Sequence, residues 1–334
     1  MKKSVFKILL SVICSSFVLS FAGCKKSNNT QNVQTKKISV FSINQNAEEI
    51  QVEVLQNANR VVVLDLAVLD ILDNLGLGDK VVGSVSTNIE YITKYANDSS
   101  IIKCGTVKEV DFEKILEANP DIIFAGGRLQ KDFNQLSEIA PTVILPSLTS
   151  KGLFETVKFN ANEIAKIWGK EAQVANLTNS FSNRIQTLKS KANGKTAIIA
   201  MCTNGGFNVL GNNARCSIIG NEIGFTNIGI DFAETHGRGT RNTSTSMHGN
   251  EVSFEFVLNE NPDYVFVMDR DSAIGAKGAK LATEILDNEL INSTQAAKDG
   301  HVVILANPEV WYTAEGGITA FDIMLKDLES TILE

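Results

Sequence analysis

Two stretches of sequence decide the fold: VDFEKILEANPDIIF at residues 110–124 and VSFEFVLNENPDYVF at residues 252–266. The second begins 142 positions after the first and aligns with it without a gap, so the chain contains an internal repeat. In each copy, Asp111 or Ser253 is suited to cap a short helix, and Asn-Pro-Asp ends that helix. The apolar run that follows is typical of a buried strand. The repeat therefore predicts two lobes of one design.

An arginine follows each copy of the repeat at the same distance. Arg128 and Arg270 both stand four positions after the repeated stretch, beyond the carboxyl end of the predicted strand. In open α/β sheets, ligands bind at that end of the strands. We expect the two arginines, one from each lobe, to face a single cleft.

Strand and helix patterns around the repeat complete an N-terminal lobe at 38–150 and a C-terminal lobe at 193–334. In the first lobe, a strand, a helix and a second strand follow one another, which is typical of a parallel sheet. Its expected elements are a hairpin at 38–41 and 51–55, strands at 60–64, 81–85, 122–125 and 142–145, and helices at 66–75 and 131–140. Those of the second lobe are strands at 197–201, 264–268 and 302–305, and helices at 214–222, 254–259, 279–290 and 318–333.

Residues 151–192 join the two lobes. Apolar residues recur there at helical spacing, and no proline interrupts the segment. We expect a helical connector that behaves as a stiff strut and limits the lobes to small closure motions. The predicted fold class is α/β, with two Rossmann-like lobes that have mainly parallel sheets and are joined by a long α-helix.

Residues 1–23 have the composition of an export signal, with three lysines, no acidic residue and a largely apolar run. That run is short and interrupted by serines, whereas a membrane span needs about 20 apolar residues. The sequence SFAGC, which ends at Cys24, resembles a bacterial lipobox and predicts that Cys24 is lipidated. The polar residues 24–37 indicate a flexible tether. We therefore expect a lipid-anchored protein outside the cytoplasmic membrane, on a surface of the Gram-positive type.

Composition narrows the possible functions. A hydrophobic content of 43% and a charged content of 21% are typical of a folded globular protein. The formal net charge of -7 argues against a nucleic-acid-binding protein, whose affinity would come from counterion release. Beyond the signal and the anchor, the cysteines are Cys104, Cys202 and Cys216, and their spacing does not indicate a zinc site. Cys202 and Cys216 could form a disulfide, or all three could be small buried side chains.

Several further stretches, taken together with the repeat, are similar to a known family. They are RVVVLD at 60–65, LGLGDKVVG at 75–83, DRD at 269–271, ILDNEL at 285–290 and PEVWY at 308–312. The chain resembles the lipid-anchored iron-siderophore solute-binding proteins of ABC importers, which have the helix-linked, class III periplasmic-binding-protein fold. The likeness is greatest to the branch that takes catecholate or petrobactin-type ferric complexes. It implies a monomeric carrier, not an enzyme, with no permanent cofactor and a ferric siderophore as its transported ligand.

The resemblance implies a set of residues around the ligand. Arg128 and Arg270 match the arginines at the strand ends, and Arg215 is the best match for a third, although the family pattern around it is only partly kept. A ferric catecholate is a compact anion, and guanidinium groups offer it permanent charge with several fixed donors. Only seven arginines occur in the chain, so three in one cleft would concentrate a large share of them.

The resemblance also implies residues beside the iron: His248, which precedes Gly249, and Tyr312 of the Trp311–Tyr312 pair. Fe(III) is a hard ion that accepts phenolate oxygen and imidazole nitrogen. His248 and Tyr312 could complete its shell if the siderophore supplies four donors, but could only pack or hydrogen-bond if it supplies six. His236 is an alternative to His248, because it also precedes a glycine. The segment 234–246 resembles an insertion, and it brings Arg238 and Arg241.

Glu113 and Glu255 occupy equivalent positions in the two copies, each in the first turn of a predicted helix. A favourable interaction with the helix dipole would be enough to explain both residues. The resemblance implies a further role, in which one glutamate from each lobe docks onto a permease dimer. The 142-residue repeat then supplies the pseudo-twofold arrangement that a dimeric partner needs.

Other classes of protein fit the sequence less well. A zinc or manganese carrier would need a cluster of ligands such as histidine, and the chain has three histidines in all. A haem or cobalamin carrier on the same fold stays open as an alternative, although three arginines favour an anion. An extracellular hydrolase is the alternative among enzymes, but the chain has neither a Gly-x-Ser-x-Gly elbow nor a His-Glu-x-x-His motif.

Overall fold

The computed structural model describes residues 36–147, 150–229 and 249–333. The predicted signal peptide, Cys24 and nearly all of the tether therefore lie outside the described residues, and so do His236 and His248. Within these three ranges, no helix is both long enough and apolar enough to cross a membrane.

The N-terminal lobe contains a five-stranded sheet in the order β5-β4-β3-β6-β7, and every neighbouring pair of strands is parallel. All residues of the neighbouring strands β3 and β6 are buried, as expected for strands covered on both faces. The strands are β3 (Val61–Leu64), β4 (Val81–Ser84), β5 (Ile102–Lys103), β6 (Ile122–Ala125) and β7 (Thr142–Ile144). The helices are α1 (Leu66–Asn74), α2 (Thr93–Asn97), α3 (Phe112–Glu117) and α4 (Phe133–Ile139). The predicted parallel sheet is confirmed.

The predicted N-terminal hairpin is also confirmed, since β1 (Lys37–Ile43) pairs antiparallel with β2 (Glu49–Leu55). Short 3₁₀ helices at Gly78–Lys80, Glu90–Ile92 and Gly127–Asp132 complete the lobe. The last of these lies between β6 and α4, at the carboxyl edge of the sheet, and therefore determines where residue 128 lies.

The C-terminal lobe has a mixed sheet, in the order β11-β9-β8-β12-β13, with β10 also paired to β8. Strands β8, β10, β12 and β13 run parallel to one another, whereas β9 is antiparallel to both β8 and β11. The prediction of mainly parallel sheets was therefore incomplete for this lobe. The strands are β8 (Thr196–Thr203), β9 (Gly206–Val209), β10 (Thr226–Asn227), β11 (Asn250–Glu251), β12 (Tyr264–Asp269) and β13 (Val302–Ile304).

A tight turn at Asn204 and Gly205 produces the antiparallel part of this sheet. Both residues have positive φ, 51° and 78°, and Thr203 pairs directly with Gly206. A two-residue loop of this kind is typical of a β-hairpin, and Asn-Gly is its strongest sequence signal. The chain therefore turns back at once, where a continuing parallel sheet would have required a crossover.

Two helices of this lobe, those predicted at 214–222 and 279–290, are shorter than the sequence patterns suggested. The helices of the lobe are α8 (Ser217–Asn221), α10 (Phe254–Glu260), α11 (Arg270–Ala273), α12 (Ala282–Leu286), α13 (Glu289–Asn292), α14 (Gln295–Lys298), α15 (Pro308–Thr313) and α16 (Ile318–Ile332). The single helix expected at 279–290 is divided into α12 and α13. The side chain of Asn288 accepts a hydrogen bond from the backbone N–H of Leu290 and begins a new helix there.

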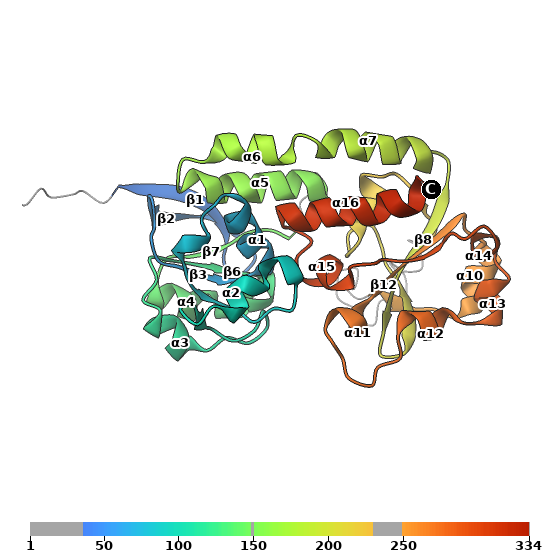
Figure 1. Ribbon diagram of the computed structural model, residues 1–334, viewed down its shortest axis with the longest axis horizontal. Helices are drawn as coiled ribbons and strands as arrows, with labels where there is room; N and C mark the ends of the chain where they lie inside the picture. Colours follow the sequence, from blue (N-terminus) through green and yellow to red (C-terminus); the bar gives the residue numbers. More distant parts are fainter. Residues whose placement is uncertain (1–35, 148–149, 230–248, 334) are drawn as a thin grey trace, which may run out of the picture. The chain divides into compact units, whose positions relative to one another are not determined.

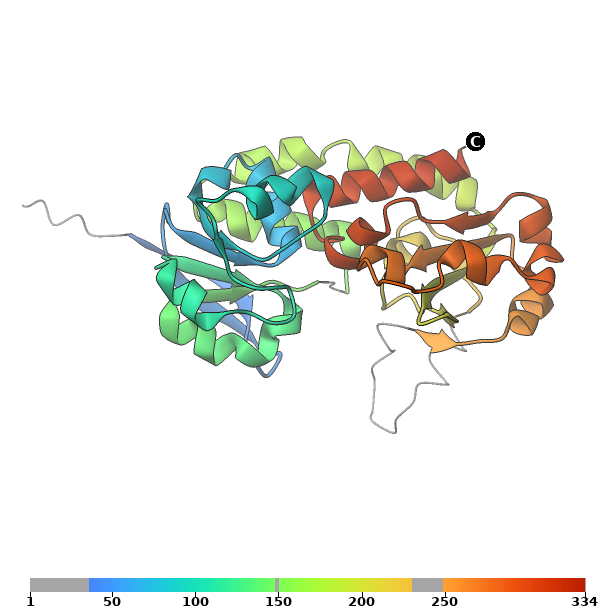
Figure 2. The same ribbon diagram turned by 60° about the horizontal axis from the view of Figure 1, so that its bottom comes forward.

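The connector is helical, as predicted, but it consists of three helices. They are α5 (Leu153–Lys166), α6 (Glu171–Thr178) and α7 (Phe181–Ala192). The chain leaves α5 at Gly169, which has a φ of 64° that favours glycine, and α6 then packs back against α5. In Figures 1 and 2, α6 and α7 follow one another along one side of both lobes, and α16 lies beside them. The link between the lobes is therefore a layer of helices.

Two carboxylates, one buried and one half-buried, hold this helical layer onto the lobes. Asp70 of the N-terminal lobe accepts hydrogen bonds from the backbone N–H groups of Thr319 and Ala320 at the start of α16, at 3.0 and 2.9 Å. Glu222 of the C-terminal lobe accepts from the N–H groups of Leu153 and Phe154 at the start of α5. Each carboxylate satisfies donors that a helix start leaves unpaired. Burial raises the pKa of both, to about 6 for Asp70.

The three cysteines of the folded region are free and buried. Cys202 and Cys216 therefore do not form a disulfide, which leaves the alternative of small buried side chains. Burial raises the pKa of the thiols of Cys104 and Cys202 to about 12.

Candidate functional site

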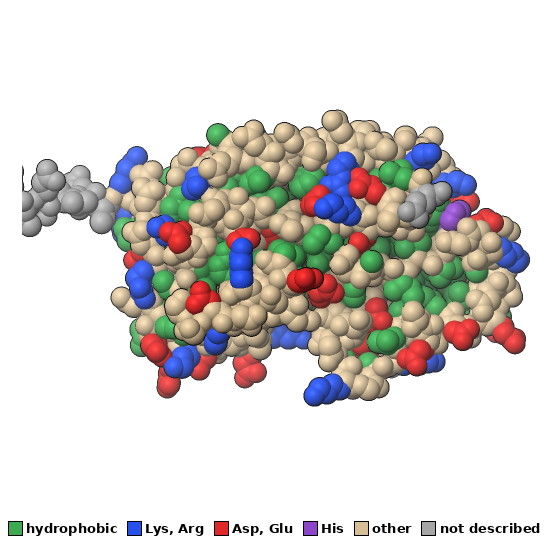
Figure 3. Space-filling view, in the orientation of Figure 1, with side chains coloured by type: hydrophobic (Ala, Val, Ile, Leu, Met, Phe, Trp, Pro, Cys, Tyr) green, Lys and Arg blue, Asp and Glu red, His purple; other side chains and the backbone are tan. Residues whose placement is uncertain are grey.

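A pocket of about 670 Å³ lies between the two lobes. Its lining comes from the carboxyl edge of the N-terminal sheet, from α5, and from the segments that contain Arg215, Arg270 and residues 312–316. Figure 3 shows that the lower outline of the molecule is hollowed between the lobes, with basic side chains visible there. The pocket occupies the position in which the sequence predicted a cleft.

The repeated arginines meet at one tyrosine. Arg128 lies in the 3₁₀ helix that follows β6, and its Nη2 donates to the backbone oxygen of Tyr312 at 3.2 Å. Arg270 is the first residue of α11, directly after β12, and its Nε donates to the hydroxyl of Tyr312 at 3.2 Å. The structure therefore brings the two equivalent arginines, one from each lobe, to the same residue.

Arg215 completes the group from the loop before α8. Its Nη1 donates to the backbone oxygen of Tyr312 at 2.5 Å and lies 3.8 Å from Oε1 of Glu315. Its Nε is buried and has no hydrogen-bond partner. A buried guanidinium N–H without an acceptor is costly, so the contacts of Nη1 with Tyr312 and Glu315 have to offset that cost.

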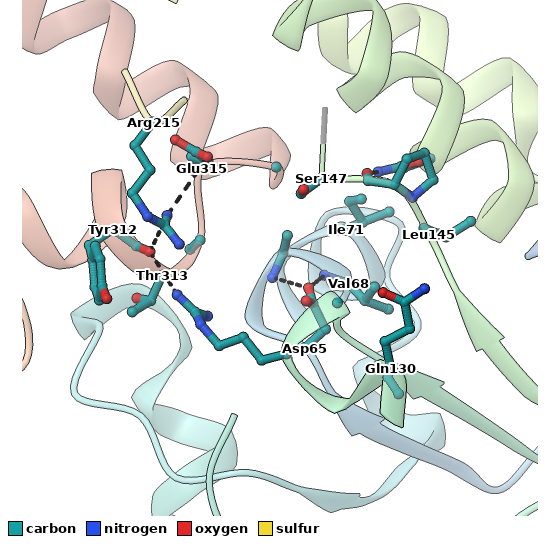
Figure 4. Close-up of a pocket in the computed structure, with 18 of the residues that line it drawn as sticks. Asp65, Val68, Ile71, Gln130, Leu145, Ser147, Arg215, Tyr312, Thr313 and Glu315 are labelled. Carbon is teal, nitrogen blue, oxygen red and sulfur yellow. Dashed lines mark hydrogen bonds and ion pairs between the residues drawn. The ribbon is translucent and has the colours of Figure 1, made fainter. Parts of the chain in front are cut away.

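Tyr312 lies at the centre of the three arginines. The guanidinium carbons of Arg128, Arg215 and Arg270 lie 5.5, 4.3 and 5.5 Å from the centre of its ring, and Figure 4 shows the hydrogen bonds to its backbone oxygen. Burial acts to raise the pKa of the Tyr312 phenol, but the hydrogen bond from Arg270 and the three positive charges lower this pKa overall. The arrangement makes this phenol easier to ionise, and a phenolate is a hard oxygen ligand.

Trp311 does not belong to this group, contrary to the sequence-based prediction that it contacts the ligand. Its side chain is fully buried, and its Nε1 donates to Oδ2 of Asp327 at 2.8 Å. Trp311 and Tyr312 are consecutive in α15, so their side chains leave the helix about 100° apart. Tyr312 consequently faces the arginines while Trp311 fills the core.

Two acidic residues of the pocket were missed by the sequence analysis. Asp65 follows β3 and caps α1 by accepting from the N–H groups of Ala67 and Val68, at 2.9 and 3.1 Å. Glu315 lies beside Arg215. Burial raises the pKa of both carboxyl groups, against the attraction of nearby arginines. Asp65 stands at a strand end, so the rule that selected Arg128 would have selected it too, whereas Glu315 has no comparable signal.

The lining of the pocket is basic on balance, in a protein whose formal net charge is -7. Its ionisable residues other than Tyr312 are four basic and two acidic side chains, namely Lys108, Arg128, Arg215, Arg270, Asp65 and Glu315. The positive charge is therefore concentrated at this site, which suits an anionic ligand.

The histidine predicted to lie beside the iron, His248, is outside the described residues, as are its alternative His236 and the two arginines of the inserted segment. Among the residues that the structure does describe, no group of three or more His, Cys, Asp and Glu side chains could hold a metal ion.

The predicted docking glutamates are both exposed. Glu113 lies in the first turn of α3 and Glu255 in the first turn of α10. The repeat therefore places one exposed carboxylate at the same position in each lobe.

Comparisons with known proteins agree with this architecture. The chain is 30% identical to the petrobactin-binding protein YclQ of Bacillus subtilis over 332 residues, which cover 98% of each chain. It is 27% identical to the ferric-anguibactin-binding protein FatB of Vibrio anguillarum, again over 98% of each chain. The crystal structure of YclQ superimposes with a TM-score of 0.78, covering 90% of this chain and 99% of that one.

A second solved structure is that of the periplasmic catecholate-siderophore binding protein VctP from Vibrio cholerae. It is 25% identical, has a TM-score of 0.75, and covers 88% of this chain and 100% of its own. The family model described as periplasmic binding protein matches residues 61–308. This match spans both lobes and the helical layer between them, and the chain therefore belongs to the periplasmic binding protein family.

Proposed function

We propose that this protein captures a ferric siderophore of the catecholate type in the pocket between its lobes and delivers it to an ABC permease. The observation that carries the proposal is the convergence of Arg128, Arg215 and Arg270 around Tyr312. The names of the relatives support it, because YclQ is a petrobactin-binding protein and VctP a catecholate-siderophore binding protein.

The chemistry of the pocket explains why the ligand would be an anionic chelate. Phenolate oxygens of a ferric catecholate carry negative charge at the surface of the complex, and planar guanidinium groups bind such oxygens with directed, charge-assisted hydrogen bonds. Arg128, Arg215 and Arg270 line the pocket and would offer such groups to the ligand from both lobes.

We further propose that Tyr312 approaches the iron, with His248 as its partner, when the siderophore leaves two coordination positions open. The lowered pKa of Tyr312 supports a phenolate ligand. The histidine is proposed from the sequence alone, and His236 is its alternative.

Titration with defined ferric complexes tests these proposals. The soluble protein, residues 38–334, is titrated with tetradentate and hexadentate ferric catecholates, a ferric hydroxamate, cobalamin and haemin, and tryptophan fluorescence is followed with inner-filter correction. Submicromolar quenching by the catecholates is expected, with a shifted charge-transfer band for the tetradentate complex alone. Quenching without that shift would contradict the proposal that Tyr312 and His248 coordinate the iron. Binding of haemin or cobalamin alone would overturn the ligand assignment.

For delivery, we propose that Glu113 and Glu255 each contact one subunit of a permease dimer, while lipidated Cys24 holds the monomeric protein at the membrane. Replacing both glutamates with alanine should leave binding of the ferric complex unchanged and abolish transport in proteoliposomes that contain the permease. The matched control replaces Glu109 and Glu260, two other exposed glutamates of the two lobes, and should transport normally. Equal transport by the two double variants would contradict the docking proposal.

A further inference from the structure

The two aspartates on either side of Arg270 are both buried, with exposed fractions of 5% for Asp269 and 3% for Asp271. Asp269 holds the backbone, because its Oδ1 accepts from the N–H of Ser272 at 2.9 Å and its Oδ2 from the N–H of Ala282 at 2.7 Å. Burying a carboxylate is costly unless it is paired and hydrogen-bonded. The contacts of Asp271 must therefore explain why a second carboxylate is buried here.

Asp271, Thr203 and Arg270 form a closed ring of hydrogen bonds. Nη1 of Arg270 donates to Oδ1 of Asp271 at 2.9 Å and to Oγ1 of Thr203 at 3.2 Å. The Thr203 hydroxyl donates in turn to Oδ1 of Asp271 at 3.3 Å. Thr203 reaches this ring because β8 and β12 are parallel neighbours in which Cys202 pairs with Asp269. Two side chains, one from each strand end, therefore hold the same nitrogen of Arg270.

The second oxygen of Asp271 is fixed by the turn between β8 and β9. Oδ2 accepts from the backbone N–H of Asn204 at 2.6 Å, and Asn204 begins this tight turn with a φ of 51°. Hydrogen bonds to an ionised carboxylate are shorter and stronger than those between neutral groups. Asp271 is therefore anchored independently of Arg270 and can serve as a rigid support for it.

These contacts leave one nitrogen of Arg270 for a ligand. Nε donates to the hydroxyl of Tyr312, and Nη1 takes part in the ring. Within the three described ranges, Nη2 has no hydrogen-bond partner, and it is not one of the fully buried atoms that lack a partner. The side chain of Arg270 is 18% exposed and lines the pocket. Nη2 is therefore the donor that Arg270 can offer to a ligand.

We propose that Asp271 and Thr203 are positioning residues, which hold the guanidinium group of Arg270 in its binding orientation before the ligand arrives. A long side chain loses rotamer freedom when it is fixed, and a side chain that is already fixed does not lose this freedom on binding. Neither Asp271 nor Thr203 lines the pocket, so both act through Arg270. The inference rests on the proposed function and adds to it two residues that control one of its arginines.

An effect of charge alone would have the opposite sign to an effect of positioning. Removing the negative charge of Asp271 should strengthen the binding of an anion if only the net charge near the pocket matters. Loosening Arg270 should weaken that binding. Thr203→Val removes the hydroxyl group from the ring without any change of charge, so it tests positioning alone.

The test measures the affinity of the ferric complex of a hexadentate tris-catecholate by fluorescence quenching. This complex leaves no coordination position open, so its binding reports on the arginines. Thr203→Val should weaken binding about threefold and Asp271→Asn about fivefold. In an Arg270→Met background, each substitution should change the affinity by less than about twofold, because residues that act through one side chain are coupled to it.

The matched control is Thr196→Val, at the other end of β8. The Thr196 hydroxyl donates to Oδ2 of Asp263 at 3.0 Å, so this substitution also separates a threonine from an aspartate, but neither residue lines the pocket. Thr196→Val should bind the ferric complex with wild-type affinity. Circular dichroism and the denaturation midpoint show which variants fold, and if Asp271→Asn does not fold, Thr203→Val decides the test.

Two outcomes would overturn the inference while the proposed function stands. One is wild-type or tighter binding by Thr203→Val or by Asp271→Asn, which would mean that their contacts do not position Arg270 for the ligand. The other is an equal loss of affinity in the wild-type and Arg270→Met backgrounds, which would indicate a general defect of the lobe. If the folded wild type does not bind the ferric complex at all, the proposed function fails, and the inference fails with it.

Discussion

The two copies of the repeat occupy the same positions in their lobes and yet carry arginines in different electrostatic states. Arg270 has a carboxylate of its own, because its Nη1 lies 2.9 Å from Oδ1 of Asp271. In the described part of the chain, no ion pair links Arg128 to a carboxylate. Burial and the charge of Arg215 lower the pKa of Arg128. For Arg270, burial acts in the same direction, but Tyr312 and Asp271 outweigh it and raise the pKa.

This difference suggests a division of roles. Arg128 is a partly buried charge with incomplete compensation, so we expect its contact with an anionic ligand to contribute most to binding. Arg270 is already compensated and donates to the Tyr312 hydroxyl, so its main effect should be on the ionisation of that phenol. Equivalent positions in a repeat therefore need not have equivalent functions.

The two lobes also hold the helical layer through different carboxylates, Asp70 and Glu222. The first prediction concerns Asp70, whose replacement should have the largest effect on stability. Its pKa rises from 3.8 to about 6 on folding because it is buried. The folded protein then keeps a proton over a pH range in which the unfolded chain has lost it, so this contribution to stability is complete below about pH 4 and is lost as the pH rises through 6. Relative to Asp70→Asn, the wild type should lose about 3 kcal/mol of unfolding free energy across this range.

Chemical denaturation of both proteins at a series of pH values measures this difference. Glu222→Gln provides the comparison from the other lobe and should show the same sign, because burial also raises the pKa of Glu222. A difference between wild type and Asp70→Asn that does not change with pH would show that the carboxyl titrates normally.

The second prediction concerns Arg128. Arg128→Met should weaken binding of a ferric catecholate about 100-fold, since a charge-assisted contact in a buried site is lost without a compensating gain. Isothermal titration or fluorescence quenching measures the change. The control is Arg184→Met, because Arg184 is paired with Asp322 and Glu329 and does not line the pocket. If Arg128→Met lowers the affinity for the ferric catecholate less than threefold, the proposed division of roles is contradicted.

The third prediction concerns Arg270. Arg270→Met should weaken binding only about tenfold, because Asp271 already compensates this arginine, but it should raise the pKa of Tyr312. Absorbance titration can follow that phenol, since the pKa values of Tyr91, Tyr95 and Tyr264 are all raised by burial. The first tyrosine to ionise in the wild type should therefore be Tyr312. If Arg128→Met shifts this first step more than Arg270→Met does, the roles are reversed.

Much of this architecture could be predicted from the sequence because it depends on local patterns. The parallel sheet of the first lobe followed from alternating strands and helices, and the meeting of Arg128 and Arg270 followed from the ends of two repeated strands. The antiparallel β9 carried a clear local signal, Asn204-Gly205, which the sequence analysis overlooked. The break at Gly169 was equally visible as a glycine within a helical pattern.

Other features could not be predicted, because they depend on contacts between distant residues. Trp311 and Tyr312 are neighbours in sequence, and only the packing of α15 against α16 decides which of them faces the pocket. The contacts of Asp271 depend on the pairing of β8 with β12 and on the turn that follows β8, and the position of Glu315 depends on Arg215. Patterns of hydrophobicity give a helix its buried face, but they do not say which buried polar groups meet.

The smallest effects are expected when the caps of the two repeated helices are removed. Oδ1 of Asp111 accepts a hydrogen bond from the N–H of Lys114 at 3.1 Å, whereas the Ser253 hydroxyl makes no such bond at the start of α10. Asp111→Ala should therefore cost about 1 kcal/mol of unfolding free energy, through loss of both a cap and a negative charge at the helix start. Ser253→Ala should cost less than about 0.5 kcal/mol. Denaturant unfolding of the two variants measures both costs, and equal costs would contradict the difference between the two caps.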